Sequence, residues 1–547
     1  MSAAFLDRVQ SNQARLTSEL KSQYDFIVCG SGSSGSVVAR RLAENPEVNV
    51  LLLEAGGDDD SPPVMEAIQW PLNLGSERDW GFRGQPSPHV NGRSIPFGMG
   101  KVLGGGSSIN VMAWARGHKS DWDFFASEAG DSAWNYESVL QIYRRIEDWH
   151  GAPDPKYRGT GGPVFVEPDP NPNPLAPATV EGARSVGIPT FENPNGRMME
   201  SDGGASITDV RIRNGKRQSV FRSYVFPYMD RSNLTVLTEA LVTRVIFDGK
   251  RATGVEIYHG GKTKQIRAAL EIVLSLGAIN TPKVLMQSGI GDQTELARLG
   301  IPVIQHLPGV GQNFQDHPCF YCVWEYQEPQ PPRPLSGSVM YWSSGNGSQG
   351  PDLFACQVEA PLGTPETIAR FGLPEAGWTL AGGISHPNSR GRVSLAGPGP
   401  LDPVRIEANT LSDPGDLDLK AAIACVEQLR EVANSVPLRP FVKRGVMPGN
   451  LNGRELESFV RDAATTYWHQ TCTAKMGRDE MSVVDGRLKV YGVDNLRIAD
   501  GSIMPRVTTG NAMAPCVIIG ERAAEILREA HNIEHTEVPD PEESVAR

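Results

Sequence analysis

The chain has 547 residues and a formal net charge of -12 at pH 7. This length allows several domains, or a few large interwoven ones, and so leaves room for a buried cofactor. The acidic balance disfavours an extended phosphate-binding surface, so no nucleic-acid partner is expected. No apolar run approaches the ~18 residues that a membrane helix needs, and no membrane span is expected.

Charged side chains run through the first 22 positions, so this segment lacks the apolar region of a secretory signal. The spacing of Phe5, Val9 and Leu16 predicts instead an amphipathic N-terminal helix within residues 1–22. At the other end, residues 531–547 are acidic and poor in apolar side chains, which predicts a disordered tail.

Seven cysteines are scattered along the chain, and this odd number does not resemble a disulfide framework. Their usage favours a reducing, cytoplasmic location. Cys319 and Cys322 form a single CxxC motif, which is weak evidence for metal or redox chemistry. We expect no metal site, and we expect these two side chains to lie on the same face of a strand.

The first periodic elements form a βαβ unit. Residues 24–29 (YDFIVC) are an apolar run typical of a buried strand, and the turn at residues 30–35 (GSGSSG) follows it. Residues 36–44 have helical composition, and residues 48–53 form a second buried strand that ends at Glu54. This order of elements is that of a dinucleotide-binding unit.

The turn explains why glycine recurs there. Gly30 permits a tight turn, Gly32 lets the backbone approach a pyrophosphate, and Gly35 lets the helix pack on the strand. Glu54 can accept hydrogen bonds from ribose hydroxyls. These features predict a bound adenosine dinucleotide but do not distinguish FAD from NAD. The expected contacts here are Gly30, Gly32, Ser34, Gly35, Glu54 and Ala55.

The rest of the chain alternates loops with further elements. Residues 56–98 are rich in Gly, Pro, Asp and Ser, which is typical of long loops. Residues 234–246 and 252–276 are strand-rich, with a hairpin turn at residues 248–249. Helices are predicted at 416–435, 453–464 and 514–530, and a short strand at 496–499.

Further blocks of sequence carry a family resemblance. Residues 100–123 (GKVLGGGSSINVMAWARGHKSDWD) and 277–291 (GAINTPKVLMQSGIG) resemble the two signature patterns of the glucose-methanol-choline (GMC) oxidoreductases. The run at residues 309–318 and the C-terminal block extend the resemblance over nearly the whole chain. The resemblance implies that the cofactor is FAD and that the reaction is oxidation of an alcohol.

The resemblance also implies an α/β fold, α+β overall. A Rossmann-like FAD-binding domain is interwoven with a substrate domain built on an antiparallel sheet flanked by helices. We expect the cofactor domain to comprise residues 23–152, 203–308 and 465–530, and the substrate domain to comprise residues 153–202 and 309–464.

Several flavin contacts follow from the resemblance. A second glycine turn, at residues 104–106, lies along the flavin in this family. Some relatives attach FAD covalently through a histidine at the position of Ile109, so non-covalent binding is expected here. The contacts carried over from the family are Gly105, Ser107, Asn110, Val111, Val242, Asp500, Gly501 and Met513.

Alcohol oxidation needs a base for the hydroxyl proton while hydride passes to flavin N5, and histidine suits this role. His469 matches the catalytic histidine of the family, and its partner position falls on Asn511. Asn511 can donate a hydrogen bond but cannot accept the proton. Trp468 is a candidate wall of the substrate site. The other histidines, His317 among them, are expected to be loop or packing residues.

The substrate is predicted only as a class. Met513 stands where many relatives carry a second asparagine, and residues 98–99 replace a more polar pair, so we expect a primary, relatively apolar or aromatic alcohol. Electrons then pass to oxygen or to another acceptor, as in a dehydrogenase. A hydroxynitrile lyase and a scaffold with a vestigial flavin site are the alternatives. The oligomeric state is not set by the sequence.

Overall fold

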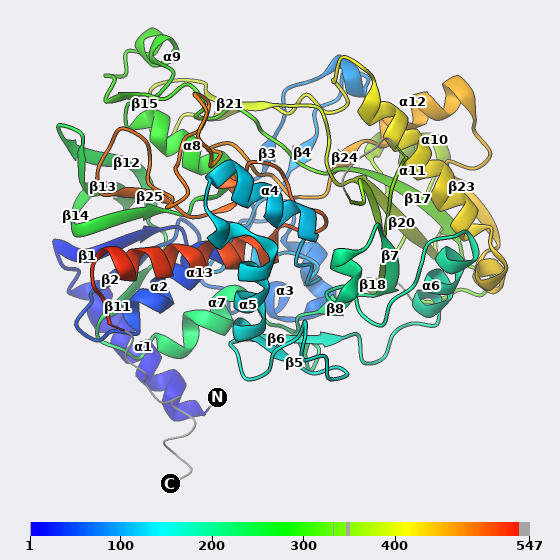
Figure 1. The fold of residues 1–547 in the computed structure, drawn as a ribbon, viewed down its shortest axis with the longest axis horizontal. Coiled ribbons are helices and arrows are strands. Elements are labelled where there is room, and N and C mark those ends of the chain that lie inside the picture. The colour runs from blue at the N-terminus through cyan, green and yellow to red at the C-terminus, as the bar shows by residue number, and fades with distance from the viewer. Residues whose placement is uncertain (1, 332, 346–349, 535–547) are drawn as a thin grey trace.

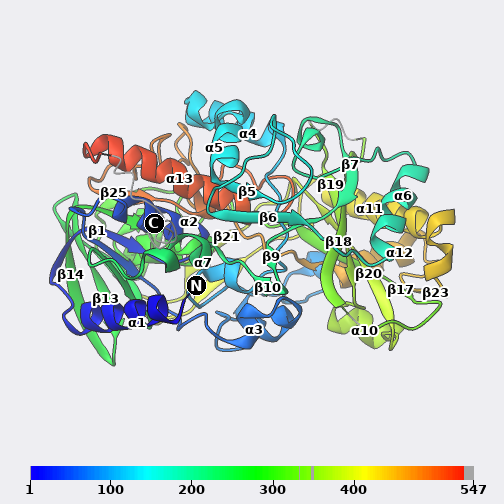
Figure 2. The ribbon, with the colours of Figure 1, turned by 90° about the horizontal axis from the view of Figure 1, so that it is seen from below.

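The computed structural model describes residues 2–331, 333–345 and 350–534. The predicted disordered tail therefore lies outside the described residues from position 535 onward. The chain forms two halves that lie side by side along the longest axis (Figures 1 and 2). Each half is built on a seven-stranded sheet and has its own apolar core. No helix in the described ranges is long and apolar enough to cross a membrane.

The first sheet has the strand order β11-β2-β1-β14-β13-β12, and β25 pairs with β14. Its core strands are parallel, whereas β12, β13 and β14 form antiparallel pairs. The apolar runs that predicted buried strands are almost fully buried here. Its strands are β1 (Gln23–Cys29), β2 (Val50–Leu53), β11 (Leu234–Leu237), β12 (Leu241–Asp248), β13 (Arg251–His259), β14 (Lys262–Leu274) and β25 (Leu496–Ile498).

Helices α2 (Ser33–Ala43) and α13 (Met513–Ala530) pack against each other on this sheet (Figure 1). Arg41 of α2 pairs with the buried Glu521 of α13 at 2.9 Å, which joins segments far apart in the sequence. The N-terminal helix α1 (Ala3–Ser18) packs against the edge strand β11 through Phe5, Val9 and Leu16. The remaining helices of this half are α4 (Lys119–Ala129), α5 (Tyr136–Ile146), α7 (Val220–Tyr224), α8 (Gly277–Gln287) and α9 (Gln293–Arg298).

The second sheet is antiparallel and has the order β23-β17-β20-β19-β18-β7, with β24 paired to β17. Its strands are β7 (Gly204–Ile207), β17 (Pro318–Glu325), β18 (Arg333–Trp342), β19 (Leu353–Glu359), β20 (Gly377–Ile384), β23 (Arg444–Met447) and β24 (Thr465–Thr466). Its helices are α6 (Leu175–Ser185), α10 (Pro365–Phe371), α11 (Leu417–Ala433) and α12 (Gly453–Ala463). A parallel-core half joined to an antiparallel half confirms the predicted fold class.

Short elements connect the two halves or decorate them. The short helices are α3 (Pro62–Met65) and the 3-10 helices η1 (Ala67–Asn73), η2 (Pro88–Val90), η3 (Gly105–Ser108), η4 (Ser132–Trp134), η5 (Arg197–Glu200), η6 (Phe226–Tyr228), η7 (Val436–Phe441) and η8 (Gly501–Ile503). The short strands are β3 (Phe82–Arg83), β4 (Pro96–Phe97), β5 (Glu147–Trp149), β6 (Val164–Pro168), β8 (Asp209–Val210), β9 (Ile212–Arg213), β10 (Lys216–Arg217), β15 (Ile290–Gly291), β16 (Gln305–His306), β21 (Arg392–Leu395) and β22 (Val404–Glu407).

The structure differs from the sequence-based expectations at a few places. Strands β7 and β24, which begin at or next to the expected domain boundaries at residues 203 and 465, pair with the second sheet. Helices α4, α5, α6, α8 and α9 were not predicted. Cys319 and Cys322 lie on opposite faces of β17, not on the same face, because residues three apart in a strand alternate sides.

Candidate active site

The first glycine turn joins β1 to the N-terminus of α2. Gly30 has a φ of +98°, and a Cβ there would lie 2.3 Å from the Ser275 carbonyl oxygen. A Cβ at Gly35 would lie 1.9 Å from the Gly30 carbonyl oxygen. At Gly32, by contrast, a Cβ would meet no protein atom within 4 Å. Gly30 and Gly35 are therefore required by the fold, whereas Gly32 opens into free space at a helix N-terminus, as a pyrophosphate site needs.

The second glycine turn faces the first. A Cβ at Gly105 would lie 2.9 Å from the Cα of Gly32. The two turns are joined through Ser31, whose hydroxyl accepts from the Gly104 N–H at 3.1 Å and donates to Glu54 at 2.6 Å. Burial raises the pKa of Glu54, and its hydrogen bonds oppose that shift. The two glycine turns and Glu54 are thus joined through one serine hydroxyl.

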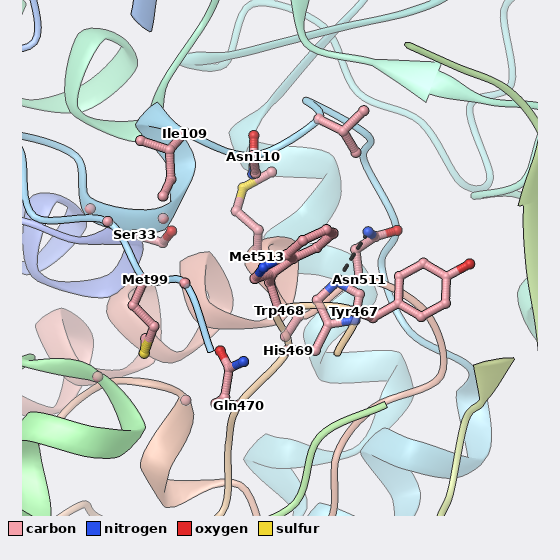
Figure 3. A pocket seen from close by; sticks show the side chains of 18 of the residues that line it. Ser33, Met99, Ile109, Asn110, Tyr467, Trp468, His469, Gln470, Asn511 and Met513 are labelled. Carbon is pink, nitrogen blue, oxygen red and sulfur yellow. Dashed lines mark hydrogen bonds between the residues drawn. The ribbon is translucent and has the colours of Figure 1, made fainter. Parts of the chain in front are cut away.

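One cavity of about 420 Å³ runs from these turns to His469, between the two halves of the molecule. Figure 3 shows Ser33 and Ile109 toward one part of it and Tyr467, His469 and Asn511 toward another. The cavity brings together fourteen of the predicted site residues. They are Gly30, Gly32, Ser34, Glu54, Ala55, Gly105, Asn110, Val111, Trp468, His469, Asp500, Gly501, Asn511 and Met513.

Three predicted contacts do not line the cavity. Gly35 packs against the Gly30 carbonyl. The Ser107 hydroxyl accepts from the Val220 N–H at 3.0 Å and donates to the Gly104 carbonyl at 2.7 Å, so it shapes the turn. Val242 is buried within β12. The structure therefore does not place these three residues at the cavity surface.

Asp500 lies at the end of β25 and faces the cavity with its carboxylate already engaged. It accepts from the backbone N–H of Gly277 at 2.9 Å, the hydroxyl of Thr281 at 2.6 Å and the N–H of Ser502 at 2.8 Å. Burial raises the pKa of Asp500, while these donors favour its ionised form. Asp500 therefore fixes the strand end against α8 and leaves backbone at Gly501 exposed to the cavity.

His469 is presented by a tight segment that follows β24. Trp468 has a φ of +61°, a conformation uncommon for a bulky residue and found mostly where a site requires it. Asp316 accepts from the backbone N–H of His469 at 2.8 Å and from that of His317 at 2.9 Å. Burial raises the pKa of Asp316 to about 7. This carboxyl group fixes the two histidine backbones relative to each other.

The hydrogen bonds of His469 set its tautomer. Its Nε2 lies 3.2 Å from Asn511 Nδ2, and its Nδ1 lies 2.8 Å from His317 Nδ1. The amide nitrogen of Asn511 can only donate, so Nε2 accepts and Nδ1 carries the proton that it donates to His317. Burial lowers the pKa of His469 to about 3 and that of His317 well below its usual range. His469 is therefore neutral, with an unprotonated nitrogen on the cavity side.

His317 is a neighbour of His469 that the sequence analysis did not predict. It is fully buried in the loop before β17, and its ring lies 5.0 Å from that of His469 at 83°. The expectation that His317 is a loop or packing residue is thus incomplete, because its Nδ1 is the hydrogen-bond partner of His469. The signal available in the sequence was its place between Asp316 and the start of a strand, but nothing there indicated His469, 152 residues away.

The end of the cavity around His469 is lined mainly by apolar, aromatic and thiol groups. The rings of Trp70 and Trp468 meet edge to face at 6.3 Å, and Tyr467 stacks on His469 at 5.6 Å. Of the described residues that line the cavity, only Glu54 and Asp500 are acidic, and both lie by the glycine turns. The other lining residues of this end include Leu74, Met99, Cys319, Tyr321, Cys356, Val358, Leu362 and Ala381.

The residues fit a flavin dinucleotide. Gly32 and Gly106 each leave room for a ligand where a Cβ would otherwise meet nothing, at the N-terminus of α2 and at the second turn. Beyond them the same cavity continues to a neutral histidine paired with an amide donor. This combination defines an FAD-dependent oxidoreductase that acts on alcohols.

Comparison with known proteins gives the family. GMC oxidoreductase family models match residues 24–319 and 387–520. An oxygen-dependent choline dehydrogenase of Brucella anthropi is 34% identical, over 92% of this chain and 95% of its own. The mitochondrial choline dehydrogenase of Mus musculus is 35% identical, over 95% and 92% respectively. Pyridoxine 4-oxidase from Mesorbium loti has a TM-score of 0.87 and 30% identity, and the match covers 94% of this chain and 100% of that one.

The chain therefore belongs to the GMC oxidoreductase family, as the sequence resemblance implied. Its cofactor is FAD, and its activity is oxidation at a CH–OH group. These comparisons do not support the hydroxynitrile lyase alternative.

Proposed function

We propose that this protein oxidises a neutral primary alcohol with an apolar or aromatic substituent to the aldehyde, with His469 as the base. The observation that carries the proposal is the unprotonated Nε2 of a neutral, buried histidine at the end of a cavity that begins at two glycine turns. FAD, when bound, accepts hydride from the alcohol carbon at N5.

His469 and Asn511 divide the work on the hydroxyl group. The hydroxyl group of a bound alcohol would replace the Asn511 N–H as the donor to His469 Nε2, whose lone pair then takes the hydroxyl proton. The imidazolium ion that forms keeps its Nδ1–H hydrogen bond to His317 Nδ1. Asn511 Nδ2 donates to the substrate oxygen, which orients the hydroxyl toward the base. Asp316 keeps both histidine backbones in place through two N–H donors.

The lining of the cavity supports the substrate class. Aromatic rings attract the ammonium group of a cationic alcohol such as choline, and a nearby carboxylate adds to that attraction. Around His469 the described lining offers indole, phenol, thiol and aliphatic groups and no carboxylate. Relatives named choline dehydrogenase and pyridoxine 4-oxidase act on alcohols of different charge and ring character. The apolar lining around His469 favours an uncharged alcohol that carries a ring.

The mode of cofactor binding and the electron acceptor are also proposals. Ile109 lines the cavity and offers no nucleophile to the flavin, which supports non-covalent binding. Acid precipitation should then release yellow FAD into the supernatant. We propose oxygen as the acceptor, in keeping with relatives named as oxidase and as oxygen-dependent dehydrogenase. Hydrogen peroxide formed per aldehyde in air tests this, and a ratio near zero would favour a different acceptor.

The proposal also assigns a role to each half of the molecule and a cellular location to the protein. The first sheet and its helices hold the cofactor, and the second sheet supplies the wall of the alcohol site. All seven cysteines are unpaired, which supports a reducing, cytoplasmic location.

Replacement of His469 tests the proposed base. His469→Ala should slow anaerobic flavin reduction by about two to four orders of magnitude, the scale of general-base removal. FAD content should stay near the wild-type level, because His469 lies at the far end of the cavity from the glycine turns. His306→Ala, at an exposed histidine, is the matched control and should reduce its flavin at the normal rate. Near-normal reduction by an FAD-replete His469→Ala protein would refute the assignment.

A further inference from the structure

Two buried arginines behind the cavity have no carboxylate partner. Five arginines are buried in the described part of the chain, at positions 116, 158, 211, 217 and 497. Three of them pair with carboxylates: Arg116 and Arg158 with Glu147, and Arg497 with Glu271. Arg211 and Arg217 make no ion pair with any described residue, although only 2% and 1% of their surfaces are exposed.

Their remaining contacts are few. Arg211 Nη1 donates to the sulfur of Met513 at 3.0 Å, and its Nε and Nη2 are buried with no hydrogen-bond partner. Arg217 Nη1 donates to Asn110 Oδ1 at 2.8 Å and to the Ser107 carbonyl at 3.2 Å, and its Nε donates to the Val64 carbonyl at 2.8 Å. Its Nη2 has no hydrogen-bond partner among the described residues. Burial lowers the pKa of each to about 9, so both remain charged at neutral pH. Each also lies close enough to the other for mutual repulsion.

Such an arrangement is costly in an isolated chain. A buried charge without a counter-charge destabilises the fold by several kcal/mol in general, and a guanidinium group cannot escape by losing its proton. Paired arginines elsewhere in this chain show that the fold can supply carboxylates where charge is to be neutralised. Either a group outside the chain supplies the counter-charge, or the uncompensated positive charge of the two arginines itself serves a function.

The contacts of the two arginines lead to the cavity. Met513 and Asn110 both line it, between the glycine turns and His469 (Figure 3). A flavin that accepts hydride from an alcohol at His469 would place its ring in this stretch. Met513 and Asn110, which accept from Arg211 and Arg217, would then be among the residues that hold the ring.

We propose that Arg211 and Arg217 form a permanently charged pair that stabilises the negative charge on the reduced flavin. In the half-reaction the hydroxyl proton goes to His469 and hydride goes to FAD, which leaves one negative charge on the ring. The pair raises the flavin reduction potential and so favours alcohol oxidation. The inference rests on the proposed function, because the role of His469 sets where the ring would lie, but it does not depend on which alcohol is oxidised.

Sulfite titration tests the pair without substrate. Sulfite adds to oxidised flavin and leaves a negative charge on the ring, so its affinity reports nearby positive charge. Arg211→Gln and Arg217→Gln should each weaken sulfite binding about tenfold or more, the scale of one charge a few ångströms away in a protein interior. Both should also lower the flavin midpoint potential. Arg211→Lys and Arg217→Lys, which keep the charge, should restore most of the affinity.

Arg497→Gln is the matched control, because it removes an equally buried guanidinium group that pairs with Glu271 and does not line the cavity. It should leave sulfite affinity unchanged. Unaltered sulfite affinity and potential in FAD-replete Arg211→Gln and Arg217→Gln proteins would overturn the proposal. Should these variants fail to fold, the spectrum of the fully reduced wild-type flavin decides: an anionic form at neutral pH supports the pair, and a neutral form refutes it.

Discussion

The two ends of the cavity are built by different means. At the cofactor end, glycine backbone from two turns surrounds the free space. Within each turn, the required glycines lie only a few residues apart in sequence. At the alcohol end, side chains from η1, β17, β19, β20 and the segment after β24 converge from positions scattered along the chain. A backbone site tolerates few changes, whereas a side-chain site can be altered one residue at a time to change the substrate.

Two glycines of the same turn separate cofactor binding from folding. Gly32→Val should weaken FAD binding at least about a hundredfold, because the new side chain fills space meant for a pyrophosphate. The apoprotein should melt at the wild-type temperature, since no protein atom lies within 4 Å of the added Cβ. Gly35→Ala should instead destabilise the fold by about 3 kcal/mol or more. FAD titration and thermal melts of both variants check this, and equal loss of stability would show that Gly32 is merely structural.

Asn511 offers a change at the alcohol end that leaves the cofactor end intact. Asn511→Leu removes the donor to the substrate oxygen and should slow flavin reduction about a hundredfold, the usual loss for one such donor. Stopped-flow reduction at saturating alcohol measures it. Asn511→His, which keeps a donor at this position, should recover part of the rate. A rate within a few-fold of wild type in the leucine variant would remove Asn511 from the mechanism.

The depressed pKa of His469 has a consequence for stability. In the unfolded chain this histidine binds a proton near its ordinary pKa of about 6.5, whereas in the folded state its pKa is about 3. The unfolded state therefore binds more protons between these values, and stability falls as pH drops through that window. When the pH is lowered from 7 to about 5, the free energy of unfolding of His469→Asn should fall by about 1–2 kcal/mol less than that of the wild type. Denaturant melts at both pH values test this, with exposed His306→Asn as the control.

Trp468 should give the smallest effect. Its ring is partly exposed and meets Trp70 edge to face, so it forms a wall of the cavity rather than a reacting group. Trp468→Ala should raise KM for an aromatic alcohol about three- to tenfold, with kcat little changed. A large fall in kcat with unchanged KM would indicate that the strained turn at Trp468 positions His469, and Trp468→Phe would then separate the ring from the turn.

The same contrast explains what the sequence could predict. The glycine turn and Glu54 lie in a contiguous motif whose chemistry is local, and the parallel strands follow from their apolar runs. His469 and Asn511 were predicted only through the family resemblance. The roles proposed for His317, Arg211 and Arg217 depend on contacts over long separations, such as that of Arg211 with Met513, 302 residues away. The hydrophobic periodicity of the sequence does not reveal contacts between residues so far apart. The expectation for Cys319 and Cys322 was wrong because three residues are an odd step along a strand.

Anaerobic mixing of the FAD-bound wild-type protein with alcohols tests the central claim most directly. Benzyl alcohol should bleach the flavin rapidly and to completion, because the cavity holds a neutral ring beside His469 and Asn511. Choline at the same concentration should bleach it far more slowly, because no described lining residue near His469 carries a negative charge. Rapid bleaching by choline with none by benzyl alcohol would contradict the account.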